Sequence, residues 1–311
     1  MAEPMMRQVI SRIAGQSWLR KAVVSTPGIR EVAWRFVAGE DLAAGIAVLR
    51  SLNARGIKGT LNYIGTHVKD EAEAVAAATA AIEALRCVHA EGLDANLSVK
   101  LTQIGLDIDE AFCRAQLRRI LECAAKTGNF VRIDMEESRY VESTLRILED
   151  MLDVYGADTV GIVLQSYLRQ RKSDLERMLA RGSSIRLVKG GYWESSDIVY
   201  RRKVDIDNAF HQDLKVLLPK GRYPAIATHD ARFLVQARRI ADEAGMDPRT
   251  FEFQLLYGVR PDLQTELIRD GYNVRCYVPY GGNWYAYLLG CVRRIPGGIF
   301  RRVSEWIRPV S

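Results

Sequence analysis

The stretch from Val160 to Val188, VGIVLQSYLRQRKSDLERMLARGSSIRLV, has two short apolar runs on either side of a polar segment. The run Val160–Gln165 is almost wholly apolar at its centre, which is typical of a parallel strand covered on both faces, and Ser184–Val188 holds Arg186 between apolar neighbours. The residues between them leave room for one helix and end in the turn signal Arg181-Gly182. This stretch therefore predicts one strand–helix–strand unit of an α/β fold.

The same unit recurs along most of the chain. The other predicted strands are Gly59–Ile64, Asn96–Leu101, Phe130–Met135, Ala225–Thr228, Phe251–Leu255 and Val274–Val278. Helical periodicity is clearest in Glu71–His89, Ile108–Lys126 and Val141–Tyr155. Eight strands alternating with helices over residues 58–294 predict a (β/α)8 barrel. A doubly wound open sheet is the alternative, because the pattern alone does not prove closure.

The chain divides into two predicted parts without a Gly/Ser/Pro-rich linker between them. Residues 1–57 are expected to form an N-terminal helical cap, and residues 58–311 the catalytic barrel with a C-terminal helical tail. The predicted helices of the cap are Arg7–Ile13, Trp18–Val24, Arg30–Phe36 and Leu42–Arg55.

The composition is that of a soluble globular protein. Of the 311 residues, 48% are hydrophobic and 26% are charged, which argues against disorder. The most apolar stretch, Val75–Leu85, is too short and too rich in Ala to span a membrane. The first residues carry charges where a signal peptide needs an apolar block, so we expect a cytoplasmic protein.

Charge, cysteine and histidine patterns exclude several further classes. The net charge is +6, but Lys and Arg are interleaved with acids and no recognition motif accompanies them, so we expect no nucleic-acid partner. The five cysteines form no C-x-x-C pair and the four histidines form no H-x-x-x-H pair. We therefore expect reduced thiols and no metal site.

Polar residues stand where several predicted strands end, which is where (β/α)8 enzymes place their chemistry. They are Lys100, Arg132, Asp134, Gln165, Arg186, Lys189-Gly190-Gly191, Thr228-His229, Glu252, Gln254 and Tyr277. Arg186 is the most informative, because an arginine inside an apolar strand needs an anionic partner. Structural alternatives remain open: Lys100 and Asp134 as a simple pair, Gly190-Gly191 as a tight turn and His229 as a hydrogen-bonded structural residue.

Common nucleotide and hydrolase motifs are missing. The sequence has no G-x-x-x-x-G-K-[ST], no G-x-G-x-x-G and no G-x-S-x-G. Their absence disfavours a P-loop site, a Rossmann nucleotide site and an α/β-hydrolase.

Seven collinear motifs resemble the proline dehydrogenase family of flavoenzymes over roughly residues 36–288. They are LSVKLTQIGL, VRIDMEES, VLQSYLR, IRLVKGGYWE, ATHD, FEFQLLYGVRP and VRCYVPYG. The resemblance implies a distorted (β/α)8 barrel that holds FAD. It also implies oxidation of L-proline to 1-pyrroline-5-carboxylate by hydride transfer to the flavin, with electrons passed to a membrane quinone.

The resemblance also implies roles for individual residues. Asp134 and Arg186 are expected to be catalytic, with Arg186 stabilising the reduced flavin. The expected substrate-binding residues are Lys100, which pairs with the carboxylate, and Tyr277, Tyr287, Arg293 and Arg294. The expected cofactor-binding residues are Met135, Gln165, Arg186, Val188, Lys189, Gly190, Gly191, Thr228 and His229.

Two departures from the family pattern concern one ion pair. The arginine pair that grips the carboxylate in the family normally follows the tyrosine matching Tyr287 by three and four residues, where this chain has Gly290 and Cys291. The pair occurs three residues later, as Arg293-Arg294, and Arg294 keeps the helical face of Tyr287. Thr66 replaces the acid that pairs with one of those arginines as a gate. A different cyclic or secondary amine is therefore an alternative substrate.

Three other questions stay open at this level. The basic, amphipathic segment at residues 296–311 is expected either to pack on the barrel or to touch the inner face of the membrane near a quinone. A barrel lyase using Lys100 or Lys189 as a Schiff-base amine is an alternative enzyme. A non-catalytic FAD-binding protein is the alternative outside enzymes.

Overall fold

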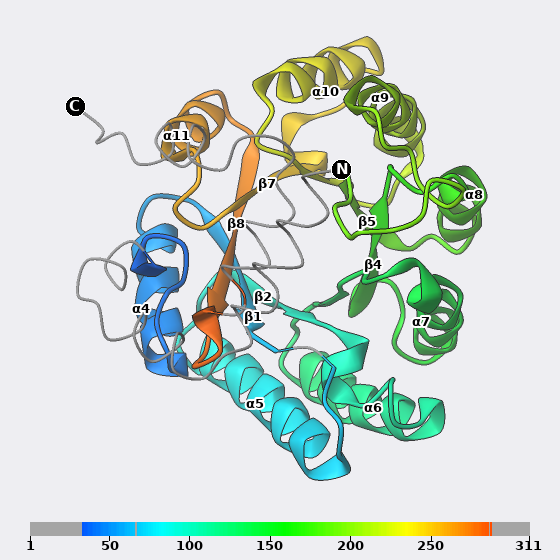
Figure 1. Cartoon of the computed structure of the whole chain (residues 1–311). Helices are drawn as coiled ribbons and strands as arrows, with labels where there is room; N and C mark the ends of the chain where they lie inside the picture. Colours follow the sequence, from blue (N-terminus) through cyan, green and yellow to red (C-terminus); the bar gives the residue numbers. More distant parts are fainter. Residues whose placement is uncertain (1–32, 66, 286, 288–311) are drawn as a thin grey trace, which may run out of the picture.

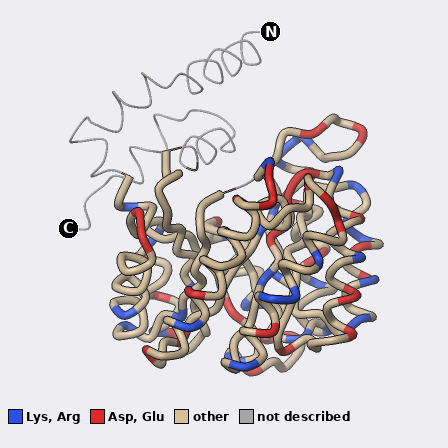
Figure 2. Tube along the Cα trace, turned by 90° about the horizontal axis from the view of Figure 1, so that it is seen from below, with Lys and Arg blue, Asp and Glu red and all other residues tan. Residues whose placement is uncertain are grey.

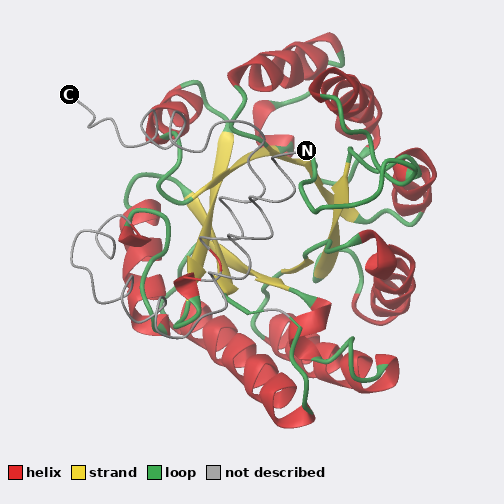
Figure 3. Ribbon diagram, viewed as in Figure 1, coloured by secondary structure: helices red, strands yellow, loops and turns green. Residues whose placement is uncertain are grey.

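A computed structural model describes residues 33–65, 67–285 and 287, and its centre is a closed barrel. The eight strands are all parallel and pair in chain order, and the first also pairs with the last (Figure 3). They are β1 (Lys58–Tyr63), β2 (Ala95–Val99), β3 (Val131–Ile133), β4 (Val160–Gln165), β5 (Ser184–Val188), β6 (Ala225–Ala227), β7 (Glu252–Leu256) and β8 (Asn273–Tyr280). The predicted barrel is confirmed, and the open sheet is wrong.

Helices of the described part form a ring outside the barrel (Figure 1). They are α4 (Leu42–Asn53), α5 (Glu71–Ala90), α6 (Glu110–Lys126), α7 (Val141–Tyr155), α8 (Arg171–Ala180), α9 (Lys203–Lys220), α10 (Ala231–Glu243) and α11 (Pro261–Arg269). Aspartates fix several of their beginnings: Asp41, Asp70 and Asp109 each accept a hydrogen bond from the backbone N–H three residues later. Such caps satisfy amide groups that have no partner within the helix.

Strand boundaries agree closely with the sequence pattern. β4, β5 and α7 begin and end where the sequence predicts. β3 is shorter than the predicted Phe130–Met135, because the chain leaves the strand at Asp134, whose N–H still donates to the carbonyl of Val99. Of the predicted cap, α4 is described in full, Arg30–Phe36 is described only from residue 33, and Arg7–Ile13 and Trp18–Val24 lie outside the described residues.

Alternation along the strands separates an apolar shell from a polar interior. In β5, Ile185 and Leu187 are buried in the hydrophobic core, whereas Ser184 and Arg186 bond to polar groups inside the barrel. Successive residues of a strand point to opposite faces, so one set packs under the helices and the other fills the barrel. The polar interior is therefore where the chemistry of this fold has to be sought.

The surface adds no single charged face in the described part. Basic and acidic residues are interspersed around the helical ring (Figure 2). Among the described helices, none combines the length and the apolar character needed to cross a membrane.

Candidate functional site

Asp134 is the centre of a group of buried polar side chains at the C-terminal ends of the strands. Its Oδ1 accepts hydrogen bonds from Ser98 Oγ at 2.6 Å and from an Arg186 guanidinium nitrogen at 2.8 Å. Its Oδ2 accepts from Tyr277 Oη at 2.7 Å, and Lys100 Nζ lies 3.5 Å away. We call these five residues the upper cluster. They come from β2, β3, β5 and β8 or the residue after each strand, so barrel closure is what assembles them.

The two cations keep Asp134 ionised. Burial alone would raise the pKa of this carboxyl, but Lys100 and Arg186 outweigh burial, and the pKa lies below its ordinary value. Burial and the neighbouring carboxylate raise the pKa of Tyr277 well above its ordinary value, so the phenol stays protonated and donates to Asp134. One carboxylate therefore orients two cations and a phenol.

Several buried atoms beside the upper cluster have no hydrogen-bond partner. They are Nε and a terminal nitrogen of Arg186, and Oε1 of Gln165. The amide nitrogen of Gln165 donates to the carbonyls of Met135 and Glu136, which leaves its oxygen for another donor. Buried polar groups in native proteins normally have partners. The Arg186 donors and the Gln165 acceptor thus fit the polar edge of a bound ligand.

The segment after β5 brings backbone close to this site. Val188 ends the strand, and Lys189, Gly190 and Gly191 follow. Gly190 has φ +93°, and a Cβ at this position would lie 2.1 Å from the ring of Tyr167. Only glycine fits this conformation and this space. A side chain here would collide with Tyr167, so the packing of the protein itself requires this glycine. Close approach of its backbone to a ligand stays a prediction.

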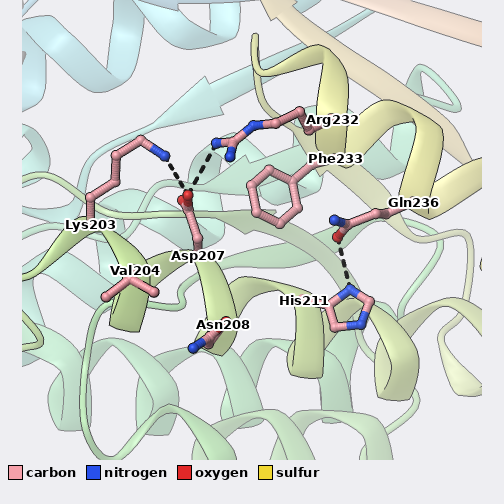
Figure 4. Close-up of a pocket in the computed structure, with 8 residues that line it drawn as sticks. All are labelled: Lys203, Val204, Asp207, Asn208, His211, Arg232, Phe233 and Gln236. Atoms are coloured by element: carbon pink, nitrogen blue, oxygen red, sulfur yellow. Dashed lines mark hydrogen bonds and ion pairs between the residues drawn. The ribbon is translucent and has the colours of Figure 1, made fainter.

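Lys189 points toward acids outside the barrel strands. Its Nζ lies 2.7 Å from Asp207 and 3.2 Å from Asp230, and 4.1 Å above the ring of Phe233. Asp207 also pairs with Lys203 and Arg232 at a cavity of about 510 Å³ between α9 and α10 (Figure 4). The charge of Lys189 is therefore already balanced.

Thr228 and His229 follow β6. Nε2 of His229 accepts a hydrogen bond from the N–H of Leu256 at 2.9 Å, which places the ring proton on Nδ1. Burial, helped by Arg260, lowers the pKa of His229 to about 4, so the ring is neutral. Thr228 Oγ1 accepts from the N–H of Asp230. The structural interpretation of His229 is compatible with this bond, which still leaves Nδ1–H as a donor.

Comparison with known proteins identifies the family to which this site belongs. The family model described as proline dehydrogenase matches residues 46–295. Proline dehydrogenase 1 of Bacillus subtilis subsp. natto is 36% identical over 269 residues, which cover 86% of this chain and 88% of that protein. The chain belongs to the proline dehydrogenase family. The expectation of an oxidoreductase of this type is thereby confirmed.

A second relative agrees with this assignment, and a solved structure agrees with the fold. Proline dehydrogenase of Deinococcus radiodurans is 35% identical over 291 residues, covering 89% of this chain and 94% of that protein. The crystal structure of proline utilization A from Bdellovibrio bacteriovorus matches with a TM-score of 0.79 and 24% identity, over 85% of this chain. This chain spans about a third of that longer protein, so the likeness concerns the fold of one part of it.

A second polar layer lies deeper in this proline dehydrogenase barrel. It contains some of the residues that the sequence pattern places at the strand ends. Arg275 donates to Glu252 at 2.8 Å and to the carbonyl of Gly59, near the start of β1. Arg132 donates to the carbonyl of Ser184, the first residue of β5. Gln254 donates to Glu252. Arg132, Glu252 and Gln254 therefore belong to a lower layer with Arg275, not to the strand-end site.

Of the remaining predicted substrate residues, only Tyr287 lies within the described part of the chain. Tyr287 is half-buried beside the small apolar cluster of Ala33, Val37, Ile64 and Trp284, and its phenol helps to raise the pKa of Tyr277. Arg293, Arg294 and Thr66 lie outside the described residues, and so does the tail at 296–311.

One group of metal-ligating side chains occurs near the barrel mouth in the described part. Ligand atoms of His67, Glu136 and Glu137 lie within 4.8 Å of one another. His67 Nδ1 is 2.8 Å from Asp107, and Glu136 accepts two hydrogen bonds from Thr102. His67 and Glu136 therefore have partners within the protein, whereas Oε2 of Glu137 is buried without a hydrogen-bond partner. The absence of a metal site stays a prediction.

Sequence reasoning missed Ser98 and Arg275. Ser98 lies two residues before Lys100 in β2, and Arg275 lies two before Tyr277 in β8. Period-two spacing in a strand places each on the same face as the residue that was found. That spacing is the signal that identifies both.

Proposed function

We propose that this member of the family is an FAD-dependent proline dehydrogenase that oxidises L-proline to 1-pyrroline-5-carboxylate and passes the electrons to a membrane quinone. The observation that carries the proposal is the pair of unpartnered, buried Arg186 nitrogens beside Asp134. A permanent cation with free donors in a barrel interior requires an electron-rich ligand. The family membership supports a flavin as that ligand.

The residues around Arg186 fit a bound flavin cofactor. FAD, when bound, supplies the hydride acceptor. Arg186 and Gln165 offer two free donor nitrogens and one free acceptor to a planar ring edge. The backbone at Met135, Val188 and Lys189-Gly190-Gly191, together with Thr228 and His229, is assigned to the rest of the cofactor.

Proline dehydrogenation removes a hydride from a ring carbon and a proton from nitrogen, so the substrate must be held by its unreactive end. Lys100 is the proposed partner of the carboxylate, because its Nζ carries three donors and lies 3.5 Å from Asp134, too far for a strong hydrogen bond. Tyr277 and Tyr287 are the proposed walls of the pocket. Arg293 and Arg294 are proposed to add a second cationic contact. Asp134 keeps Arg186 and Lys100 oriented during the reaction.

Schiff-base chemistry is the less favoured alternative. A reactive lysine needs a lowered pKa, which desolvation or a neighbouring cation provides. Lys100 and Lys189 instead lie beside carboxylates, at 3.5 Å and 2.7 Å. Borohydride in the presence of a carbonyl substrate should therefore leave both lysines unmodified. A covalent adduct at either lysine would support the lyase.

Cofactor and acceptor can be tested separately. Protein denatured by heat should release FAD, identified by chromatography and mass spectrometry, and release of no flavin would contradict the proposal. Proline-dependent reduction of a soluble quinone analogue should then be measured. FAD release without quinone reduction, but with reduction of an artificial dye, would replace only the acceptor. A flavin unchanged by every amine tested would favour the non-catalytic FAD-binding alternative.

The tail at 296–311 is proposed as a peripheral contact with anionic membranes at the cytoplasmic side. Its mixture of arginines with Ile, Phe and Trp supports this assignment. Sedimentation with anionic vesicles should pull down the full chain and leave a variant with Arg301, Arg302 and Arg308 changed to Gln in solution. Equal binding of the two proteins would contradict the contact.

A further inference from the structure

Asn62 in β1 is a fully buried amide with one unsatisfied side. Its Nδ2 donates to the carbonyl of Ser98 at 3.1 Å, while Oδ1 has no hydrogen-bond partner. A carbonyl oxygen only accepts, so the nitrogen has to face Ser98 and the amide orientation is fixed. The oxygen of Asn62 is therefore a buried acceptor to which the protein supplies no donor.

The neighbouring Asn96 shows that buried side-chain amides in this barrel do not generally have an unpaired oxygen. Asn96 lies in β2 and is also buried, but its Oδ1 accepts a hydrogen bond from Thr60 at 2.5 Å. Thr60 precedes Asn62 by two residues on the same face of β1. The side-chain oxygen of Asn96, near the start of β2, has a donor within the protein, and that of Asn62, nearer the barrel mouth, has none.

Asn62 lies beside the upper cluster. It pairs in register with Ser98, whose hydroxyl donates to Asp134 at 2.6 Å. Lys100 follows Ser98 by two residues on the next strand, so the unpaired oxygen of Asn62 belongs to the region where the carboxylate partner and the central acid meet. A ligand bound there has to bring an N–H or O–H donor, because an unmet buried acceptor is costly.

We propose that Asn62 positions the substrate by accepting a hydrogen bond from its ring nitrogen while Lys100 holds its carboxylate. This inference rests on the proposed function. The two contacts grip an amino acid at both polar ends and leave the ring carbon facing the cofactor side, where Arg186 lies. They also favour a ligand with an N–H over a ring ether of the same shape, because the ether brings an oxygen lone pair against the Asn62 oxygen.

The test compares two ligands of equal shape in matched variants. L-Proline carries the N–H, and (S)-tetrahydrofuran-2-carboxylate has oxygen in its place. Asn62→Leu should raise the KM for L-proline about tenfold to a hundredfold, the effect of one unmade buried hydrogen bond. The inhibition constant of the ether should stay within about twofold or fall, since its repulsion is removed. Asn62→Ala should give the same pattern if the leucine variant is poorly folded.

Asn96→Leu is the matched control, because it removes the same group one strand away. It should lower stability without changing the ratio between the two ligands. The role of Asn62 would be overturned if Asn62→Leu and Asn62→Ala raised the KM for L-proline and the inhibition constant of the ether equally, or changed neither. The proposed function would still stand in that case, provided that the wild type turns over proline. A wild-type flavin that proline fails to reduce would overturn the proposed function and this inference together.

Discussion

The barrel interior buries similar charges twice, with different results. In the lower layer, Arg275 is bonded to Glu252 and to a backbone carbonyl, and Arg132 uses both terminal nitrogens on β4 and β5 and leaves only Nε unpaired. In the upper cluster, Arg186 uses one nitrogen on Asp134 and leaves two unpaired. The protein supplies acceptors for nearly all arginine donors of the lower layer, whereas it leaves two donors of Arg186 without an acceptor in the upper cluster.

This difference separates stability from function within one barrel. Charges whose partners are all supplied by the protein hold the strands together, and their loss should affect unfolding. Groups with unused donors and acceptors are available to a ligand, and their loss should affect chemistry. The position of the two layers agrees with this division, since (β/α)8 enzymes work at the C-terminal ends of their strands.

The largest effect on stability is expected in the lower layer. Glu252→Gln leaves Arg275 buried without a counter-ion and should lower the free energy of unfolding by about 3–5 kcal/mol. Urea unfolding measures this change. Asp158→Asn, which removes an exposed pair with Arg222, is the control and should change little. A normal free energy of unfolding in Glu252→Gln would contradict the structural role of the lower layer. A tenfold change in the KM for proline in the folded fraction would contradict its separation from function.

The largest effect on chemistry is expected in the upper cluster. Arg186→Met should slow proline-dependent flavin reduction by about a hundredfold to a thousandfold, because a fixed cation at the reaction centre is lost. Stopped-flow absorbance after a saturating proline pulse gives the rate. Circular dichroism should show an intact fold. A rate within tenfold of the wild type would place the chemistry elsewhere.

The pH dependence of stability should report His229. Its pKa falls from the ordinary 6.5 to about 4 in the folded protein, so the native ring stays neutral while the unfolded ring takes up a proton. Stability is therefore complete above pH 6.5 and is lost as the pH falls toward 4, by about 3 kcal/mol at most. His229→Gln should flatten this part of the curve. An unchanged slope in that variant would assign the effect to other groups.

The smallest effect is expected from the neutral pair that links β1 and β2. Thr60→Val removes the hydroxyl that donates to Asn96 and should lower the unfolding free energy by about 1–2 kcal/mol. Proline kinetics should stay unchanged, measured in the same assay as for Asn62→Leu. A raised KM in Thr60→Val would show that the two layers are coupled.

The alternation of strands and helices and most strand positions could be predicted from the sequence, because period and turn signals are local. Closure is the favoured interpretation of that pattern, but only the pairing of β1 with β8 establishes it. The depth of a side chain could not. Arg132 lies in β3 and Asp134 directly follows the end of that strand, yet a rise of about 3.3 Å per residue puts them in different layers. The direction of the Lys189 side chain could not be predicted from the sequence either. It depends on Asp207 in α9 and Asp230 before α10, which only the folded chain brings together.

The residues of the candidate site followed from resemblance more than from pattern. In the structure, Asp134 contacts Arg186, Lys100 and Tyr277. The roles that the resemblance implies for them toward substrate and flavin stay predictions. Small polar residues such as Ser98 and Asn62 carry no motif of their own. Their importance lies in which of their atoms have partners, and that property exists only in three dimensions.

The most direct measurement is an anaerobic titration of the purified protein with L-proline, followed through the visible absorption band of oxidised flavin. The account predicts that the band is present and bleaches fully with proline, and that it persists in Arg186→Met over the same time. A protein that binds no flavin even after addition of FAD, or whose flavin stays oxidised with proline, would contradict the assignment of the upper cluster as the reaction centre.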